Sequence, residues 1–211
     1  MKNLTREVEA PASVSLDFTA DWFSRHIPVW EQFRAVLPGR KKFLELGSFE
    51  GRSACWLLEN LLDDDGQLYC VDTWQGSPEF AHFPEGIVEK SYERFTRNIA
   101  ISKKPGQRTL IFRNTTVIAL ASLLAKPQFH AESFDFIYID AGHMAYQTLT
   151  DAVMSWPLLK PGGVMVFDDY MWQLCDPIDR RPKCGVDAFT SLFNSQIQTL
   201  AIGDQYVVRK R

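Results

Sequence analysis

Acidic side chains stand directly behind two apolar segments of the sequence. Asp140 follows a run that begins at Phe136, and Asp168 and Asp169 follow a run that ends at Phe167. If these runs are neighbouring parallel strands, about 4.8 Å apart, the three carboxylates converge on one spot. Carboxylates that close repel one another unless a cation neutralises them or some are protonated. Oxygen ligands favour a hard divalent ion, with Mg²⁺ first and Mn²⁺ or Ca²⁺ behind it.

We therefore expect Asp140, Asp168 and Asp169 to hold a divalent metal ion. The alternative is that Asp168 and Asp169 are solvated turn residues and that only Asp140 faces a ligand. His143 lies three residues beyond Asp140, and an imidazole titrates near neutral pH. We expect His143 to act as a general base, the alternative being that it caps a helix or hydrogen-bonds an acid.

A second group of residues follows two earlier apolar segments. Glu45 precedes a turn that contains Gly47 and Gly51, and Asp72 ends the next segment. Glycine permits a sharp turn and a close approach of a helix or ligand, and a carboxylate placed like Asp72 can accept both hydroxyls of a ribose. The glycine spacing lacks the dinucleotide pattern G-x-G-x-x-G, which favours a nucleoside cofactor without a pyrophosphate. The alternative is an ordinary strand-to-helix turn.

The elements that position these residues alternate along the chain, which predicts an α/β fold with a Rossmann-like, doubly wound and mostly parallel sheet. Strands are expected at 41–46, 67–72, 108–112, 134–140 and 163–167. Helices are expected at 51–62, 85–101, 117–125, 145–159 and 186–194. A C-terminal antiparallel hairpin should turn at Gly203 and Asp204. Ligands of such a sheet bind at the carboxyl ends of its strands.

The N-terminal part is predicted to be a loose arm at 1–16 and a helical region at 17–37 that ends at Pro38 and Gly39. We expect one domain over 1–211, with the arm and helix at 1–40 and the Rossmann-like core at 41–211. The aromatic side chains of this helix suit either a lid or the surface of a homo-oligomer.

Composition sets limits on the kind of partner. The 211 residues carry a net charge of -3, with 45% hydrophobic and 23% charged residues. No broad basic field predicts binding to nucleic acid or to a membrane surface, and no apolar run reaches the roughly 18 residues of a membrane span. Without an apolar leader at 1–11, and with four cysteines interpreted as reduced thiols, we expect a cytoplasmic protein with a small-molecule substrate.

The two strand-end motifs resemble a known family. Phe43–Gly51 is similar to the first motif of class I S-adenosylmethionine-dependent methyltransferases, and Leu68–Trp74 is similar to the second. The triplet Asp-Thr-Trp that begins at Asp72 is typical of macrocin-type sugar O-methyltransferases and their cephalosporin-hydroxylase-like relatives. The resemblance covers roughly residues 41–170.

The resemblance implies a set of contacts with S-adenosylmethionine. Gly47 and Ser48 would lie near the methionine moiety, and Asp72 would bind the ribose. Thr73 and Trp74 would lie beside the adenosine, and Asn114 near the adenine. The complete set that we expect at the cofactor is Glu45, Gly47, Ser48, Gly51, Asp72, Thr73, Trp74, Asn114 and Asp140.

The resemblance also implies the reaction. Catechol-type enzymes usually have an asparagine as third metal ligand and a lysine base, whereas this chain has Asp169 and His143, as in the sugar enzymes. We therefore expect an O-methyltransferase, dependent on Mg²⁺, that acts on a small hydroxylated molecule such as a sugar or a natural-product intermediate. Loops at 75–84 and 170–183 should cover this acceptor with Phe80, Phe83 and Trp172.

Two alternatives stay open. One is a hydroxylase-like or other metal-dependent enzyme on the same scaffold, although a redox iron site prefers histidines with one carboxylate, and only His143 lies near the acids in the sequence. The other is an S-adenosylmethionine-binding module without chemistry, which would have no functional need for Asp168, Asp169 or His143.

Overall fold

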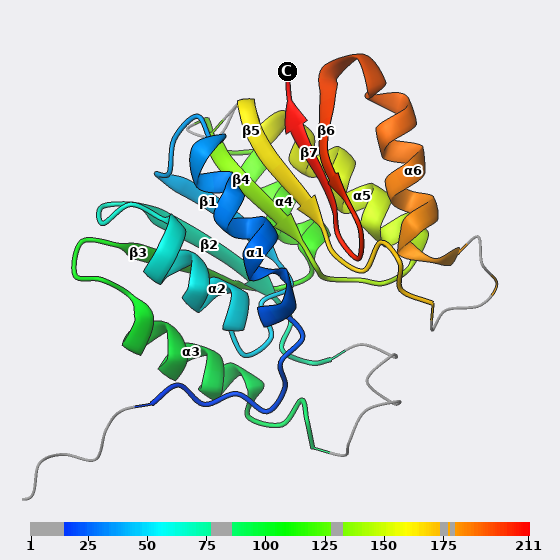
Figure 1. Ribbon diagram of the computed structural model, residues 1–211. Helices are drawn as coiled ribbons and strands as arrows, with labels where there is room; N and C mark the ends of the chain where they lie inside the picture. The colour runs from blue at the N-terminus through cyan, green and yellow to red at the C-terminus, as the bar shows by residue number, and fades with distance from the viewer. Residues whose placement is uncertain (1–14, 77–85, 128–132, 174–176, 178–179) are drawn as a thin grey trace, which may run out of the picture.

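A seven-stranded sheet forms the centre of the protein. The computed structural model describes residues 15–76, 86–127, 133–173, 177 and 180–211 (Figure 1). The strands are β1 (Lys42–Leu46), β2 (Gln67–Asp72), β3 (Arg108–Arg113), β4 (Phe134–Ile139), β5 (Leu159–Phe167), β6 (Ile197–Ile202) and β7 (Tyr206–Lys210). The α-helices are α1 (Ile27–Trp30), α2 (Arg52–Trp56), α3 (Ser91–Ser102), α4 (Thr116–Leu124), α5 (Ala145–Ser155) and α6 (Pro182–Leu192).

The strand order is β3-β2-β1-β4-β5-β7-β6. Strands β1 to β5 pair in parallel, and β7 pairs antiparallel with both β5 and β6. This arrangement confirms the predicted Rossmann-like fold and its C-terminal antiparallel hairpin. The chain direction across the sheet reverses between β1 and β4, so the carboxyl ends of β1, β2, β4 and β5 meet at one edge, where such sheets bind ligands.

Helices cover both faces of the sheet. In Figure 1, α1, α2 and α3 lie on one face, and α4, α5 and α6 lie on the other. The side chains of strand β4 are buried on both faces of the sheet. Phe136 and Tyr138 pack into the core under α1 and α2. Ile137 and Ile139 pack into the core under α4 and α5. The continuous apolar run predicted for this strand therefore reflects burial on both sides.

The N-terminal segment differs from the long helix predicted for 17–37. Residues 15–23 form no helix or strand, and helical structure begins with a 3₁₀ turn at Ser24–His26, continues in the short α1 and ends in a 3₁₀ turn at Glu31–Ala35. Tertiary packing explains the aromatic pattern, because Trp30 and Phe33 are buried against the sheet.

Strand β5 is longer than predicted. It begins at Leu159, so the expected turn at 160–163 lies inside the strand. Its pairing with β4 is irregular, because Phe134 pairs with Leu159 whereas Phe136 pairs with Val164. The run of Pro161, Gly162 and Gly163 predicts a turn. These residues instead lie at an irregularity within the strand, where glycine often marks a bulge. Helix α5 ends at Ser155, and a 3₁₀ turn at Trp156–Leu158 continues the helical segment to one residue short of its predicted end at 159.

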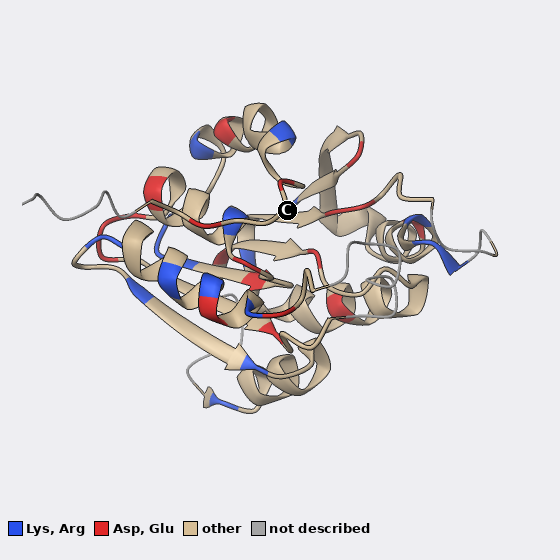
Figure 2. Ribbon diagram, turned by 90° about the horizontal axis from the view of Figure 1, so that it is seen from below, with Lys and Arg blue, Asp and Glu red and all other residues tan. Residues whose placement is uncertain are grey.

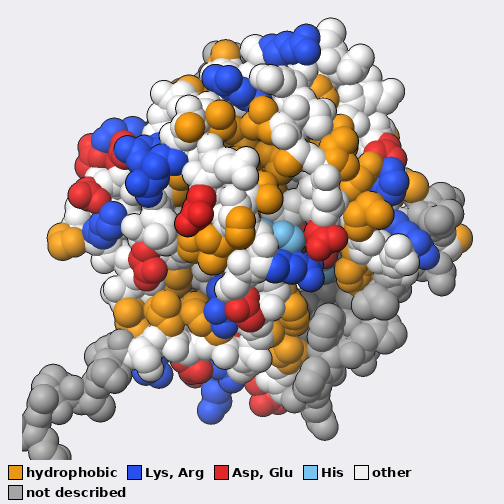
Figure 3. Space-filling model, viewed as in Figure 1, with side chains coloured by type: hydrophobic (Ala, Val, Ile, Leu, Met, Phe, Trp, Pro, Cys, Tyr) orange, Lys and Arg blue, Asp and Glu red, His pale blue; other side chains and the backbone are white. Residues whose placement is uncertain are grey.

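Charged residues are spread over the molecule. The view from below shows acidic residues at the ends of central strands (Figure 2), and basic, acidic and apolar side chains lie interspersed over the face in Figure 3. In the described ranges, no helix is both long and apolar enough to span a membrane. Cys55, Cys70 and Cys184 are free thiols, and Cys175 lies outside the described residues.

Candidate active site

The turn after β1 can be built only with glycine at its first position. Gly47 has a φ of 88°, and a Cβ there would lie 1.8 Å from the carbonyl oxygen of Asp140. Gly51 has a φ of 81° and precedes α2, and a Cβ there would lie 2.9 Å from the Phe95 ring. Both conformations favour glycine. The turn therefore brings the end of β1 against the end of β4 and packs α2 against α3.

Asp72 ties this turn to the end of β2. Its Oδ2 atom accepts hydrogen bonds from the backbone N–H of Ser48 (2.9 Å) and of Phe49 (2.8 Å). Its Oδ1 atom accepts one from the backbone N–H of Trp74 at 2.7 Å. Oδ1 keeps a second lone pair, so Asp72 can hold both turns and still accept a hydroxyl of a ligand.

Glu45 lies beneath the turn. It is fully buried, and its carboxylate accepts hydrogen bonds from the hydroxyls of Ser48 and Ser53, both at 2.6 Å. Burial raises the pKa of Glu45 to about 7. Neither Glu45 nor Gly51 is on the wall of the cavity described next. The structure thus places these two predicted contact residues behind the turn, as supports.

A cavity of about 540 Å³ opens at the carboxyl ends of the strands. The other predicted cofactor residues are on its wall: Gly47, Ser48, Asp72, Thr73, Trp74, Asn114 and Asp140. Trp74 is also a structural brace, because its indole N–H donates to the carbonyl of Phe49 at 2.7 Å and its ring packs against Tyr92 and Phe95.

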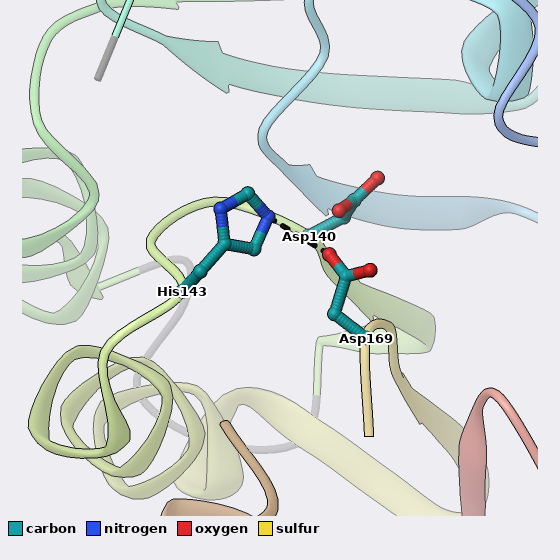
Figure 4. Close-up of side chains that lie close together, drawn as sticks. All are labelled: Asp140, His143 and Asp169. Carbon is teal, nitrogen blue, oxygen red and sulfur yellow. Dashed lines mark ion pairs between the residues drawn. The ribbon is translucent and has the colours of Figure 1, made fainter. Parts of the chain in front are cut away.

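Three potential metal ligands meet at one end of the cavity. One ligand atom each from Asp140, His143 and Asp169 lie within 4.8 Å of one another. Figure 4 shows the His143 ring facing the Asp169 carboxylate, with Asp140 beside them. The Nε2 atom of His143 lies 2.8 Å from Oδ2 of Asp169. The ring of Trp172 packs on the imidazole, with 4.8 Å between ring centroids.

Asp168, predicted as the third metal ligand, is not in this group. Its carboxylate accepts hydrogen bonds from the hydroxyl of Tyr138 and from the backbone N–H of Asp169. Asp169 adopts a left-handed φ of 54°. The carboxylate of Asp168 contacts Tyr138, whereas that of Asp169 contacts His143. Among the described residues, the group of potential ligands contains His143 and does not contain Asp168.

Two residues at the acid cluster were missed from sequence. Tyr138 is buried, and its hydroxyl oxygen also lies 2.9 Å from Oδ2 of Asp140, so two acids compete for its single proton. His26 is buried as well, with Nε2 3.8 Å from Asp168 Oδ1 and 3.0 Å from Nε of Arg25. Tyr138 could have been found, because side chains two apart on a strand share a face. His26 had no local signal.

The cluster is electrostatically unfavourable by itself. Burial raises the pKa values of Asp140 and Asp168. Repulsion from Asp168 and Asp169 raises the pKa of Asp140 further, and repulsion from Asp169 raises that of Asp168. Burial lowers the pKa of His26, although Asp168 opposes this shift. A bound cation would offset the repulsion between the carboxylates.

The family follows from the sequence between β1 and Tyr170. A family model described as "Methyltransferase domain" matches residues 44–170. The chain belongs to this methyltransferase family. No curated protein matches the chain. The match includes both turns and the acids, so this methyltransferase uses S-adenosylmethionine as its methyl donor. It does not include the N-terminal residues that pack over the sheet.

Solved structures share the fold of this methyltransferase at low identity. An O-methyltransferase from Bacillus cereus in complex with S-adenosylhomocysteine is 18% identical, with a TM-score of 0.60 over 92% of this chain and 84% of that chain. A protein described as a candidate rRNA methylase from Clostridium thermocellum is 11% identical, with a TM-score of 0.61 over 87% and 94%. MycE, a methyltransferase of mycinamycin biosynthesis in complex with Mg and S-adenosylhomocysteine, is 17% identical, with a TM-score of 0.54 over 91% and 51%.

Proposed function

We propose that this methyltransferase transfers a methyl group from S-adenosylmethionine to a hydroxyl oxygen of a small molecule, with the help of a divalent cation. The observation that carries the proposal is the convergence of Asp140, His143 and Asp169 at one end of the cofactor cavity. A sugar or a natural-product intermediate with neighbouring oxygens fits such a site, because a cation binds two adjacent oxygens at once.

The donor set fits a divalent cation. Asp140 and Asp169 offer carboxylate oxygens close enough for one ion, which suits Mg²⁺, and the nearby imidazole makes Mn²⁺ a second ion to test. When bound, the cation would act as a Lewis acid and lower the pKa of the acceptor hydroxyl. The Mg described in the MycE structure supports the proposal by analogy of fold.

The chain's own residues would bind and orient the reactants. Asp72 would accept a ribose hydroxyl at Oδ1 while it holds the two turns in place. His143 would take the proton of the acceptor hydroxyl, with Asp169 orienting the imidazole from 2.8 Å.

A cation-binding experiment tests the proposal without knowledge of the acceptor. Mn²⁺ binding, followed by electron paramagnetic resonance, should occur in the wild type and weaken at least about tenfold in Asp169→Asn. Asp187→Asn is the matched control, because this acid contacts Tyr170 and Lys183 away from the cluster. Mn²⁺ binding that Asp169→Asn leaves unchanged would refute the metal site.

A turnover experiment tests the reaction. Formation of S-adenosylhomocysteine should be measured against a panel of sugars, phenols and an rRNA transcript, because some solved structures of the same fold are described as rRNA methylases. We expect turnover with a hydroxylated small molecule, loss of turnover in EDTA and recovery with Mg²⁺. Turnover on the transcript alone, or full turnover in excess EDTA, would contradict the proposal.

The role of His143 can be separated from metal binding. A general base contributes about 10²–10⁴-fold to the rate, so His143→Gln should lower kcat at least about 100-fold while Mn²⁺ affinity stays within about twofold of the wild type. If Mn²⁺ affinity falls together with kcat, His143 is a metal ligand.

A further inference from the structure

The N-terminal segment forms part of the cavity wall. Residues 17–25, called the strap here, lie outside the residues that match the family. The strap residues on the wall are Phe18, Ala20, Trp22, Phe23 and Arg25. As far as Phe23 the strap has no helix or strand, so side chains from other elements must hold it in place.

Glu50 holds the centre of the strap. Its carboxylate accepts hydrogen bonds from the backbone N–H of Thr19 (2.6 Å) and from the Thr19 hydroxyl (2.7 Å). The guanidinium of Arg94 donates to the same carboxylate at 2.9 Å. Glu50 is buried, and bonds to a buried carboxylate are among the strong hydrogen bonds of proteins. Because Glu50 belongs to the turn between β1 and α2, strap and cofactor turn share this residue.

Two further side chains fix the start of the strap. Asn98 accepts a hydrogen bond from the backbone N–H of Asp17 at 2.8 Å and donates to its carbonyl at 2.7 Å. The guanidinium of Arg52 donates to the carbonyl of Ala20 at 3.1 Å and lies over the ring of Phe18. Most of these hydrogen bonds involve backbone atoms of the strap, so they fix the conformation of its backbone.

The strap also contacts Phe49, whose backbone N–H donates a hydrogen bond to Asp72. Trp22 stacks on Phe49 with 5.3 Å between ring centroids and an interplanar angle of 26°. Trp22 is 41% exposed although it lines the cavity. A ligand that fills the cavity would therefore contact both the strap and the turn beneath it.

We infer that the strap contributes to cofactor binding as part of the cavity wall. Glu50 is the positioning residue that couples docking of the strap against the turn after β1 to binding of the cofactor. This inference rests on the proposed cofactor cavity. The strap is held by polar contacts along its length and by the buried Phe23 near its end, and a segment without helix or strand opens locally at a lower free-energy cost than the core. A ligand that binds better to the docked form must favour docking by the same factor.

The coupling can be measured with S-adenosylhomocysteine as the only probe. Trypsin cleavage after Arg25 can be identified by mass spectrometry. When the strap opens and closes faster than trypsin cleaves, the cleavage rate reports the population of the open form. Saturating S-adenosylhomocysteine should slow this cleavage at least about fivefold, the lower end of typical couplings. Glu50→Gln, and the milder Thr19→Val, should each speed cleavage of the free protein and raise the Kd for S-adenosylhomocysteine at least about fivefold.

Glu59→Gln is the matched control, because this acid follows the same turn but contacts Ser102 outside the cavity; both readouts should stay as in the wild type. If cleavage after Arg25 is insensitive to bound S-adenosylhomocysteine, or if Glu50→Gln and Thr19→Val speed cleavage with no change in Kd, the strap is only structural. Those outcomes leave the proposed function intact. Absence of any binding of S-adenosylhomocysteine would overturn both.

Discussion

Asp72 illustrates how much of the site a single residue organises. The sequence predicted a carboxylate that binds a ribose, whereas the structure shows that the same carboxylate accepts three backbone hydrogen bonds from two turns. Its position at a strand end was readable from the apolar segment before it. The N–H partners were not, because they depend on the left-handed φ of Gly47, Phe49 and Trp74, which local sequence does not specify for a non-glycine residue.

Replacing Asp72 with asparagine should disturb both turns. The amide has only one oxygen for three N–H donors, so at least one donor loses its partner, and the charge that strengthens all three bonds is lost. We expect the Kd for S-adenosylhomocysteine, measured by calorimetry, to rise at least about tenfold. Asp65→Asn, on an exposed acid that pairs with Lys41, should leave Kd unchanged. An unchanged Kd in Asp72→Asn would argue against the proposed cofactor site.

Glu45 should give stability a distinctive pH dependence. Its pKa is about 7 in the folded protein, above the ordinary 4.5, because burial disfavours the charge. Between these values the folded state keeps a proton that the unfolded state loses, so stability falls as pH rises from 4.5 to 7. The wild type should lose up to about 3 kcal/mol relative to Glu45→Gln across this window. Urea unfolding at pH 5 and pH 8 measures this difference, and parallel pH profiles would count against it.

At the scale of elements, the parallel strands were the most predictable part. Strands β1 to β4 lie within a residue or two of their predicted bounds. Burial gives β1, β2 and β4 mostly apolar runs, whereas the edge strand β3 has exposed and half-buried residues. The predicted extent of the N-terminal helical region and the predicted start of β5 were wrong, because aromatic spacing and a Pro-Gly-Gly sequence resemble helix and turn until tertiary packing is known. The strap and its hydrogen bonds to Glu50 could not be predicted, since Thr19 and Glu50 are 31 residues apart in the sequence.

The junction between β1 and α2 should tolerate no side chain at Gly51. Alanine there must adopt a left-handed φ, which costs about 1–2 kcal/mol, and its Cβ would lie 2.9 Å from the Phe95 ring. We expect Gly51→Ala to lower the free energy of unfolding by about 2 kcal/mol or more in urea titrations. Gly203→Ala is the control, because a Cβ there meets nothing within 4 Å, and its effect should stay within about 0.5 kcal/mol.

At the scale of the whole molecule, Trp30 joins the N-terminal segment to the sheet. It is fully buried, packs edge-on against Tyr138 with 4.7 Å between ring centroids, and donates its indole N–H to Gln205 at 2.7 Å. Trp30→Ala should therefore destabilise the protein by about 3–5 kcal/mol, as large aromatic truncations do. Trp22→Ala, on a partly exposed ring of the same segment, should cost less than about 1 kcal/mol. A small effect at Trp30 would mean that the N-terminal segment is dispensable for stability.

The bond from Trp30 to Gln205 also has a consequence for biosynthesis. Its two partners are 175 residues apart, and a ribosome that adds about 5–20 residues per second needs roughly ten seconds or more to make the second after the first. During that time Trp30 lacks its acceptor, and the edge of β5 lacks β7, the strand that separates it from β6. The nascent chain thus carries an apolar N-terminal segment and an open strand edge. Slowing translation between these two regions should increase its capture by chaperones.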